Sequence, residues 1–210
     1  MRPSYDSPHR KHSMDVFGED EELFRTPPRI SWKKYGYIQV IMGPMFSGKT
    51  TELLRRVKRY SIATYKSCLV KYKNDTRYDQ DNIATHDKEL ANAISCTKLA
   101  DIYDQLKENQ VIGIDEGQFM EDLVEFCEKL ANEGKIVIVA CLDGTFQRKS
   151  FAPIPHLIPL AESVIKLKAV CMKCYADASF TKRTVESQKV ELIGGADKYM
   201  AVCRACYFEV

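Results

Sequence analysis

The stretch that decides the fold is Gly43-Pro44-Met45-Phe46-Ser47-Gly48-Lys49-Thr50, or GPMFSGKT, which matches the phosphate-binding pattern G-x-x-x-x-G-K-[S/T] at every fixed position. Glycines let the backbone turn so that its N–H groups face phosphates, and the helix that follows such a loop directs its positive end to the same place. In this arrangement Lys49 reaches the outer phosphates and the Thr50 hydroxyl ligates Mg²⁺. The stretch predicts a nucleotide site; the alternative is a glycine turn with a purely structural role.

Short apolar runs and helical patterns alternate on both sides of this loop. We expect strands at 37–42, 67–72, 111–115, 135–140 and 163–167, and helices at 51–65, 99–108 and 122–134. Strands that alternate with helices indicate a largely parallel sheet covered on both faces. The fold class is therefore predicted to be α/β.

Residues 1–35 differ from the rest of the chain. They carry four of its eight prolines and an acidic cluster at 19–22, and they show no hydrophobic periodicity. Such a segment cannot bury enough apolar surface to offset chain entropy, so we expect a disordered tail. The expected domains are this tail, an α/β nucleotide-binding domain at 36–168 and a small C-terminal domain at 169–210.

Composition limits the possible partners. The 210 residues have a net charge of +2, which gives no large basic surface for nucleic acid, and the basic run 55–59 is interpreted as the solvated face of a helix. The longest apolar run, 136–142, is far shorter than the roughly 20 residues of a membrane span. The first residues are polar and lack the apolar region of a secretory signal. We expect a cytoplasmic protein that binds neither membrane nor nucleic acid.

The stretch VIGIDEGQ at 111–118 supplies two adjacent carboxylates after an apolar strand. Asp115 would lie at the carboxyl edge of the sheet, where ligands bind in open α/β folds, and is a candidate for holding Mg²⁺. Glu116 could position an attacking water, as in an ATPase, or take a proton from a substrate hydroxyl, as in a kinase. Spacing alone does not separate these two roles, and a merely acidic strand end is the third interpretation.

Two Cys-x-x-Cys pairs near the C-terminus, Cys171 with Cys174 and Cys203 with Cys206, are separated by 28 residues. Four thiolates can close a tetrahedral zinc site, and such closed sites are structural because no position is left for water. The intervening chain would then be a long loop or hairpin anchored at its base by zinc; free or redox-active thiols are the alternative. Three of the remaining cysteines, at 68, 127 and 141, are expected in the core, and Cys96 is undecided.

The chain resembles the cytosolic, type II thymidine kinases of animals and their relatives over nearly all of residues 37–208. Seven stretches carry the resemblance in order: GPMFSGKT (43–50), KNDTRY (73–78), VIGIDEGQF (111–119), VIVACLDGTFQRK (137–149), PLAESVIKL (159–167), AVCMKC (169–174) and IGGADKYMAVCRACYF (193–208). The resemblance implies a RecA-like α/β domain, a homotetramer, and inhibition by thymidine triphosphate. It also decides between the two catalytic roles considered for Glu116. The family's glutamate at this place is the general base that deprotonates the 5′-hydroxyl of thymidine for attack on ATP, so the resemblance implies the kinase role.

The same resemblance implies the remaining site residues. ATP and Mg²⁺ would be held by the loop 43–50 together with Asp75, Arg77, Asp115 and Gln118. The segment between the cysteine pairs would be a lasso that closes over the nucleoside and recognises the thymine edge with its backbone. Zinc would act indirectly, by fixing the two ends of this segment. The expected nucleoside contacts are Met45, Phe119, Leu142, Phe146, Thr181, Val190, Glu191, Leu192, Ile193, Gly194 and Tyr199.

Two other functions share parts of this pattern. A RecA-like, nucleic-acid-dependent ATPase would have the same loop, carboxylate pair and fold, but it should also carry a strong basic face. A zinc-ribbon interaction module with a vestigial nucleotide site would show no turnover. We expect a thymidine kinase of nucleotide salvage that also accepts deoxyuridine.

Overall fold

The computed structural model describes residues 35–74, 82–84, 90–187, 189, 190, 192 and 194–209. The chain divides into two compact units, Met1–Trp32 and Lys33–Val210, and the description below concerns the second. The predicted tail and four predicted site residues, Asp75, Arg77, Glu191 and Ile193, lie outside the described residues. The three-domain division of the sequence stays a prediction.

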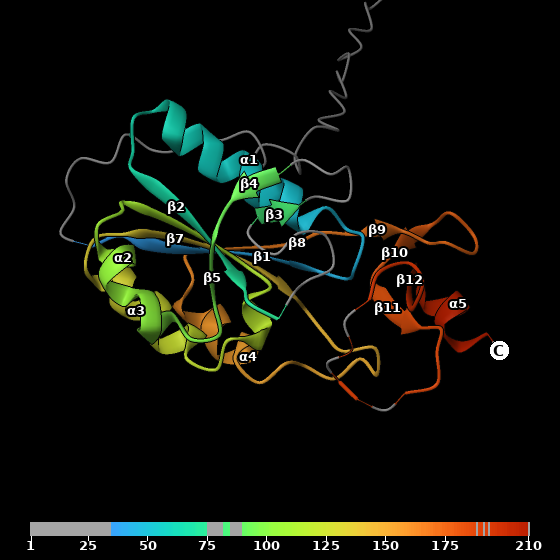
Figure 1. The fold of residues 1–210 in the computed structure, drawn as a ribbon. Coiled ribbons are helices and arrows are strands. Elements are labelled where there is room, and N and C mark those ends of the chain that lie inside the picture. Colours follow the sequence, from blue (N-terminus) through green and yellow to red (C-terminus); the bar gives the residue numbers. More distant parts are fainter. Residues whose placement is uncertain are drawn as a thin grey trace, which may run out of the picture. The chain divides into compact units, whose positions relative to one another are not determined.

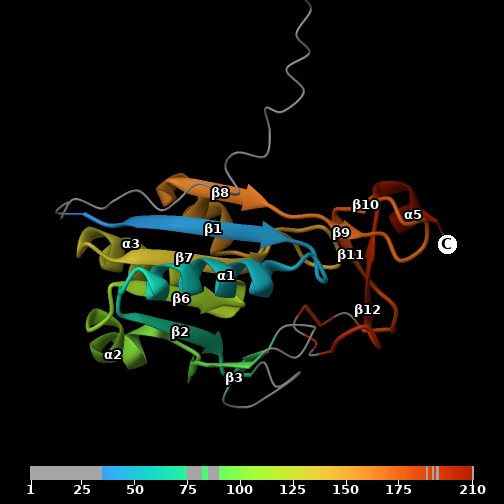
Figure 2. The ribbon, with the colours of Figure 1, turned by 90° about the horizontal axis from the view of Figure 1, so that it is seen from above.

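A six-stranded sheet forms the centre of the larger unit, in the order β5-β2-β6-β7-β1-β8 (Figure 2). Every neighbouring pair in it is parallel. Its strands are β1 (Tyr37–Gly43), β2 (Ser67–Tyr72), β5 (Ile94–Cys96), β6 (Val111–Asp115), β7 (Ile136–Leu142) and β8 (Ser163–Lys166). The predicted parallel α/β sheet is confirmed; only β5, a three-residue edge strand, was not expected.

Helices cover both faces of this sheet, as predicted. Helix α1 (Lys49–Ile62) lies on one face, and α2 (Tyr103–Lys107), α3 (Leu123–Asn132) and α4 (Ile154–Leu157) lie on the other (Figure 1). Gly113 in β6 permits the close approach of α1, because a Cβ there would stand 2.8 Å from side-chain atoms of Val57 and Leu69. The helix expected at 99–108 is instead a 3₁₀ turn, η2 (Leu99–Ile102), followed by α2.

The core is formed by the apolar faces of β1, β2, β6 and β7 and of the helices α2, α3 and α4. Cys127 and Cys141 are fully buried in it, which confirms their prediction as small core hydrophobes. Cys96, which the sequence left undecided, is buried in β5. Burial raises the pKa of the Cys141 and Cys68 thiols to about 12 and that of Cys96 to about 11, so these groups stay protonated and inert near neutrality.

The C-terminal region consists of small antiparallel pairs with a separate core. Strand β9 (Ala169–Val170) pairs with β10 (Asp177–Ala178), and β11 (Phe180–Arg183) pairs with β12 (Tyr199–Val202), followed by α5 (Arg204–Phe208). The hairpin of β11 and β12 fits the predicted loop or hairpin between the cysteine pairs. We call residues 184–198, between these two strands, the lasso loop.

Four short elements complete the secondary structure of the described residues: β3 (Asn82–Ala84), which pairs with β4 (Leu90–Asn92), and the 3₁₀ turns η3 (Gly117–Phe119) and η4 (Ile158–Leu160). Within the described ranges, none of the helices has the length and apolar character needed to span a bilayer. The strand ends Gly43, Asp115 and Leu142 meet at the carboxyl edge of the sheet, which is the edge that faces the candidate site.

Candidate active site

The phosphate-binding loop connects the end of β1 to the start of α1. Three of its residues have positive φ, namely Gly43 (156°), Phe46 (66°) and Gly48 (79°), so the backbone turns sharply before the helix begins at Lys49. At Gly43 a Cβ would stand 2.6 Å from the carbonyl oxygen of Leu167, so no larger residue fits without a backbone shift. The loop thus has the curled backbone that the sequence motif predicts.

Side chains of the loop close around one carbonyl. Lys49 is 8% exposed, and its Nζ donates to the Pro44 carbonyl oxygen at 2.7 Å. Ser47 Oγ donates to the same oxygen at 2.8 Å. The lysine is therefore held along the inner side of the loop, at the N-terminus of α1, where a phosphate binds in proteins of this architecture.

The loop also contacts the C-terminal region directly. The backbone N–H of Met45 donates to Thr181 Oγ1 of β11 at 3.0 Å, and both residues are buried. Phe46 packs against the core of the C-terminal region. Two segments more than 130 positions apart in the sequence are therefore joined at the site.

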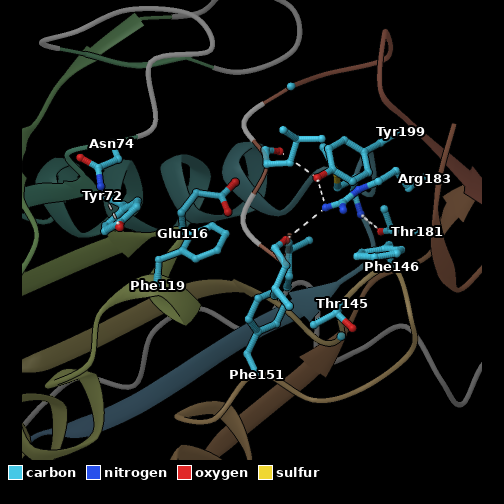
Figure 3. A pocket seen from close by; sticks show the side chains of 16 residues that line it. Tyr72, Asn74, Glu116, Phe119, Thr145, Phe146, Phe151, Thr181, Arg183 and Tyr199 are labelled. Carbon is cyan, nitrogen blue, oxygen red and sulfur yellow. Dashed lines mark hydrogen bonds between the residues drawn. The ribbon is translucent and has the colours of Figure 1, made fainter. Parts of the chain in front are cut away.

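Asp115 and Glu116 point to different parts of the site. Thr50 Oγ1 donates to Asp115 Oδ2 at 3.0 Å, which joins this carboxylate to the first turn of α1. Glu116 has left-handed backbone angles, φ 53° and ψ 36°, and its side chain enters the neighbouring pocket (Figure 3). Two carboxylates next to each other in the sequence thus serve two separate regions, one at the phosphate loop and one at the pocket.

Gln118 holds Glu116 in place. Its Nε2 donates to Glu116 Oε2 at 2.5 Å, and its Oε1 accepts the N–H of Leu142 at 2.9 Å. Gln118 is 4% exposed, so this bridge from Glu116 to the end of β7 is shielded from solvent. The sequence assigned Gln118 to the ATP and Mg²⁺ site, whereas its hydrogen bonds in the structure are to the predicted base and to the strand beside it.

The pocket beside Glu116 encloses about 560 Å³ of space, a volume that includes its opening to solvent. All nine predicted nucleoside contacts that the structure describes line it (Figure 3): Met45, Phe119, Leu142, Phe146, Thr181, Val190, Leu192, Gly194 and Tyr199. Glu116 is the only carboxylate among the described residues of the lining. The pocket therefore combines apolar walls with one acidic group.

Sequence reasoning missed six further residues of the lining: Tyr72, Asn74, Gly144, Thr145, Phe151 and Arg183. Tyr72 stacks on Phe119 at 5.2 Å between ring centroids, and Phe151 meets Phe119 edge to face at 5.6 Å. The position of Tyr72 at the end of a strand that precedes a loop was a usable signal, because the carboxyl edge of a parallel sheet is where ligands bind. Phe151 and Arg183 carried no such signal.

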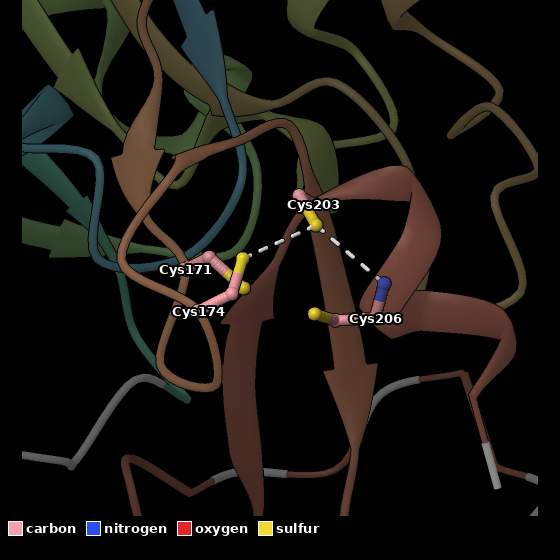
Figure 4. A group of neighbouring side chains, drawn as sticks. All are labelled: Cys171, Cys174, Cys203 and Cys206. Atoms are coloured by element: carbon pink, nitrogen blue, oxygen red, sulfur yellow. Dashed lines mark hydrogen bonds between the residues drawn. The ribbon is translucent and has the colours of Figure 1, made fainter.

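The four cysteines of the two Cys-x-x-Cys pairs come together at the base of the β11–β12 hairpin (Figure 4). Their sulfur atoms lie within 4.8 Å of one another, and Cys174 Sγ and Cys203 Sγ are 3.6 Å apart. A tetrahedral site with metal–sulfur bonds of about 2.3 Å needs sulfur–sulfur edges of about 3.8 Å. The cluster therefore fits a four-coordinate metal ion, with four sulfur donors that favour zinc.

Comparisons with known proteins agree with this geometry. The family model described as thymidine kinase matches residues 36–207. A relative from the chicken, Gallus gallus, named "Thymidine kinase, cytosolic", is 61% identical over 174 residues, which cover 83% of this chain and 78% of the relative. The relative from vaccinia virus (strain Western Reserve), named "Thymidine kinase", is 60% identical over 174 residues, 83% of this chain and 98% of its own length.

A third relative, "Thymidine kinase" of variola virus, is 60% identical over 174 residues with the same coverage. The matched region contains the phosphate-binding loop, Asp115, Glu116, the pocket and the four clustered cysteines. The chain therefore belongs to the thymidine kinase family.

Proposed function

We propose that this protein is a thymidine kinase that transfers the γ-phosphoryl group of ATP to the 5′-hydroxyl of thymidine, giving dTMP for nucleotide salvage. One observation carries the proposal most directly: Glu116 is the sole carboxylate among the described residues that line the pocket, and it directly follows the residue joined to the phosphate loop. This arrangement provides for an acceptor alcohol next to a phosphate donor. Family membership and the names of the relatives support thymidine as that acceptor.

In this proposal Glu116 is the general base. Its carboxylate accepts the proton of the 5′-hydroxyl as the alcohol oxygen attacks the γ-phosphorus and the bond to the β-phosphate oxygen breaks, with ADP leaving. Gln118 supports this role, because its hydrogen bond to Oε2 orients the carboxylate. A base that is fixed before the substrate binds loses little free energy in being aligned.

The phosphate loop would position the donor. Its backbone N–H groups and the N-terminus of α1 would hold the β- and γ-phosphates, and Lys49 would move from the Pro44 carbonyl to the outer phosphate oxygens. Thr50 and Asp115, joined at 3.0 Å, are the residues that would hold Mg²⁺. When bound, Mg²⁺ neutralises charge that develops on the transferred phosphoryl group.

Base specificity would come from the lasso loop backbone. Thymine presents a donor at N3 and acceptors at O2 and O4, whereas cytosine presents an acceptor at N3 and a donor at position 4. A rigid backbone matched to thymine would leave mispaired buried groups against cytosine, and such mismatches cost factors of ~10⁴ or more. Val190, Leu192 and Gly194 line the pocket and are the described backbone positions that would make these contacts.

We further propose that the cysteine cluster binds structural zinc, that the enzyme is a cytoplasmic homotetramer, and that thymidine triphosphate inhibits it. The four convergent sulfurs support the zinc site, and the name of the chicken relative, "Thymidine kinase, cytosolic", supports the compartment. Thymidine triphosphate would occupy the nucleoside pocket with its phosphates directed to the loop at 43–50. Light scattering of the purified protein tests the tetramer.

The product of the reaction tests the proposed function. Incubation with ATP and Mg²⁺ should give one dTMP for each ADP in the presence of thymidine, and neither inorganic phosphate nor dTMP without it. The matched control is 5′-deoxythymidine, which keeps the base and lacks the acceptor oxygen, so no phosphorylated product should form. ATP hydrolysis that is independent of thymidine and stimulated by single-stranded DNA would instead support a RecA-like ATPase.

A further inference from the structure

Arg183 occupies the point where the lasso loop leaves the hairpin. It is the last residue of β11 and pairs with Tyr199, the first residue of β12. Both residues line the pocket, but no motif in the sequence distinguished Arg183 from the basic residues around it. Its position places its side chain beside the loop that begins directly after it.

The guanidinium group binds the backbone of the loop at several positions. Nη1 donates to the carbonyl oxygens of Ser187 at 2.8 Å and Lys189 at 2.5 Å, and Nη2 donates to that of Val190 at 3.2 Å. A planar guanidinium has several N–H donors in a fixed geometry and can bind three carbonyls at once. A lysine ammonium sits on a flexible stem and cannot fix the relative positions of three carbonyls in the same way.

A relay extends this control beyond Val190. Arg183 Nη2 also donates to the Tyr199 hydroxyl at 2.7 Å, and that hydroxyl donates to the Leu192 carbonyl oxygen at 2.8 Å. Tyr199 is only 6% exposed, so the relay is shielded from competing water. One side chain thus orients the backbone at four positions of the described part of the lasso loop.

Arg183 is itself held against the wall of the pocket. Its Cζ lies 3.8 Å from the centroid of the Phe146 ring and 5.1 Å from that of Tyr199. Phe146 belongs to the segment that follows β7, so the stacked guanidinium links the lasso loop to the α/β part of the pocket. Its Nε is buried and has no hydrogen-bond partner within the described part of the chain, so the Nη contacts and the rings set its orientation.

We propose that Arg183 is the residue that determines base specificity by positioning the lasso backbone, acting through Val190 and Leu192 rather than by touching the reacting atoms. This inference rests on the proposed thymidine kinase function. Without the fork, the carbonyls of Ser187, Lys189, Val190 and Leu192 lose their common anchor, and the loop can adapt to a base with a different donor and acceptor pattern. The phosphate loop and Glu116 make no contact with Arg183 in the described hydrogen-bond network and keep their geometry.

The variant Arg183→Lys tests the proposal, because it keeps the charge and removes the planar fork. We expect KM for thymidine to rise at least tenfold while KM for ATP stays within twofold of the wild-type value. The ratio of kcat/KM for thymidine to that for deoxycytidine should fall at least tenfold. Arg204→Lys is the matched control, because Arg204 lies over the Phe180 ring of the same region and is outside the pocket lining. This variant should keep the wild-type KM for thymidine, KM for ATP and thymidine-to-deoxycytidine ratio of kcat/KM.

Two further measurements separate positioning from a loss of folding. Tyr199→Phe removes only the relay hydroxyl, and its effect on the thymidine-to-deoxycytidine ratio should be non-additive with that of Arg183→Lys, since the two residues act in one network. Amide hydrogen exchange should speed up at 184–198 in Arg183→Lys and stay unchanged in β1, β6 and β7. Bound metal per chain should equal that of the wild type.

An unchanged ratio of kcat/KM for thymidine to that for deoxycytidine in Arg183→Lys would overturn the proposal. Additive effects of Arg183→Lys and Tyr199→Phe on this ratio would overturn it as well. A fall in the active fraction with a constant ratio, and with faster exchange in the central strands, would show a merely structural role. If the wild-type protein phosphorylates no nucleoside, the proposed function fails instead, and unchanged exchange at 184–198 in Arg183→Lys would then overturn the positioning role separately.

Discussion

At the scale of single residues, the backbone of Glu116 separates two carboxylates that the sequence places side by side. Left-handed angles for a residue other than glycine cost on the order of 1–3 kcal/mol and persist where the surroundings fix them. Here the Gln118 amide and the hydrogen bond from Glu116 N–H to Asp115 Oδ1, 3.1 Å, fix the turn. The strained turn lets one side chain serve the phosphate loop and the next serve the acceptor pocket.

We predict that Glu116→Gln reduces kcat for thymidine phosphorylation by ~10²–10⁴, the range expected when a general base is lost. The amide has the same shape as the carboxylate but cannot accept the proton, so binding of ATP and thymidine should persist in calorimetry. Glu121→Gln, at an exposed glutamate five positions later, is the control and should keep the wild-type kcat. A kcat close to wild type in Glu116→Gln would exclude this glutamate as the base.

At this scale, several residues of the candidate site could be predicted from the sequence one by one. Lys49, Thr50 and Asp115 were predictable because a phosphate loop and a strand-end carboxylate have fixed spacings, and the resemblance added the pocket residues. Arg183 and Phe151 were not predictable, because their roles depend on which backbone segments meet in three dimensions. An arginine within a Lys-Arg pair looks like a solvated surface residue until its carbonyl partners are known.

At the scale of elements, α5 connects the cysteine cluster to the wall of the pocket. Cys203 caps this helix, since its Sγ accepts the N–H of Cys206 at 3.5 Å, and Tyr207 follows Cys206 directly. The Tyr207 hydroxyl donates to the Phe146 carbonyl oxygen at 2.7 Å, and Arg148 lies over the Tyr207 ring at 4.6 Å. A metal ion bound by the cysteine cluster would therefore be connected to the pocket through one helix.

We predict that Tyr207→Phe raises KM for thymidine by roughly two- to tenfold, the effect of one hydrogen bond of about 0.5–1.5 kcal/mol. KM for ATP and the bound metal should stay at wild-type values, because neither the phosphate loop nor the sulfur atoms are altered. Tyr175→Phe removes the hydroxyl of a tyrosine that is 82% exposed in the same region, and it is the control. Equal thymidine KM values in Tyr207→Phe and wild type would show that this contact does not support the pocket.

A second prediction at this scale concerns the metal. Cys203→Ser should lower bound zinc from about one ion per chain toward zero and raise KM for thymidine, because the ends of the hairpin lose their anchor. Circular dichroism should show the α/β part intact, since its core is separate from that of the C-terminal region. Cys68→Ser, which lies outside the cluster, is the control and should bind as much zinc as the wild type. Full zinc occupancy in Cys203→Ser would contradict the assignment of the cysteine cluster as the zinc site.

Element boundaries illustrate why the sequence could not predict all of the fold. Five of the six strands of the sheet carry apolar runs long enough to recognise, whereas β5 has three residues and is defined by its pairing with β2. The helix start at Lys49 depends on the left-handed Gly48, which ends the loop. The short antiparallel pairs of the C-terminal region have too few residues for a periodic pattern.

At the scale of the whole described unit, the site lies where three separate parts of the chain meet. The phosphate loop comes from the start of the α/β part, Glu116 and Gln118 from its middle, and the lasso loop from the C-terminal region. The Met45–Thr181 hydrogen bond joins the first of these parts to the last. The affinity for a nucleoside bound between these three parts would therefore depend on both the phosphate donor and the arrangement of the lasso loop.

The measurement that tests the central claim most directly is steady-state phosphorylation with ATP and Mg²⁺ across thymidine, deoxyuridine, deoxycytidine, deoxyguanosine and deoxyadenosine, with nucleoside-free ATP hydrolysis as the control. We predict rapid transfer to thymidine, measurable transfer to deoxyuridine, and a kcat/KM for deoxycytidine and the purines lower by ~10⁴ where buried polar groups are mispaired. ATP hydrolysis that is indifferent to every nucleoside would contradict the account, and Glu116 would then be a residue that positions water.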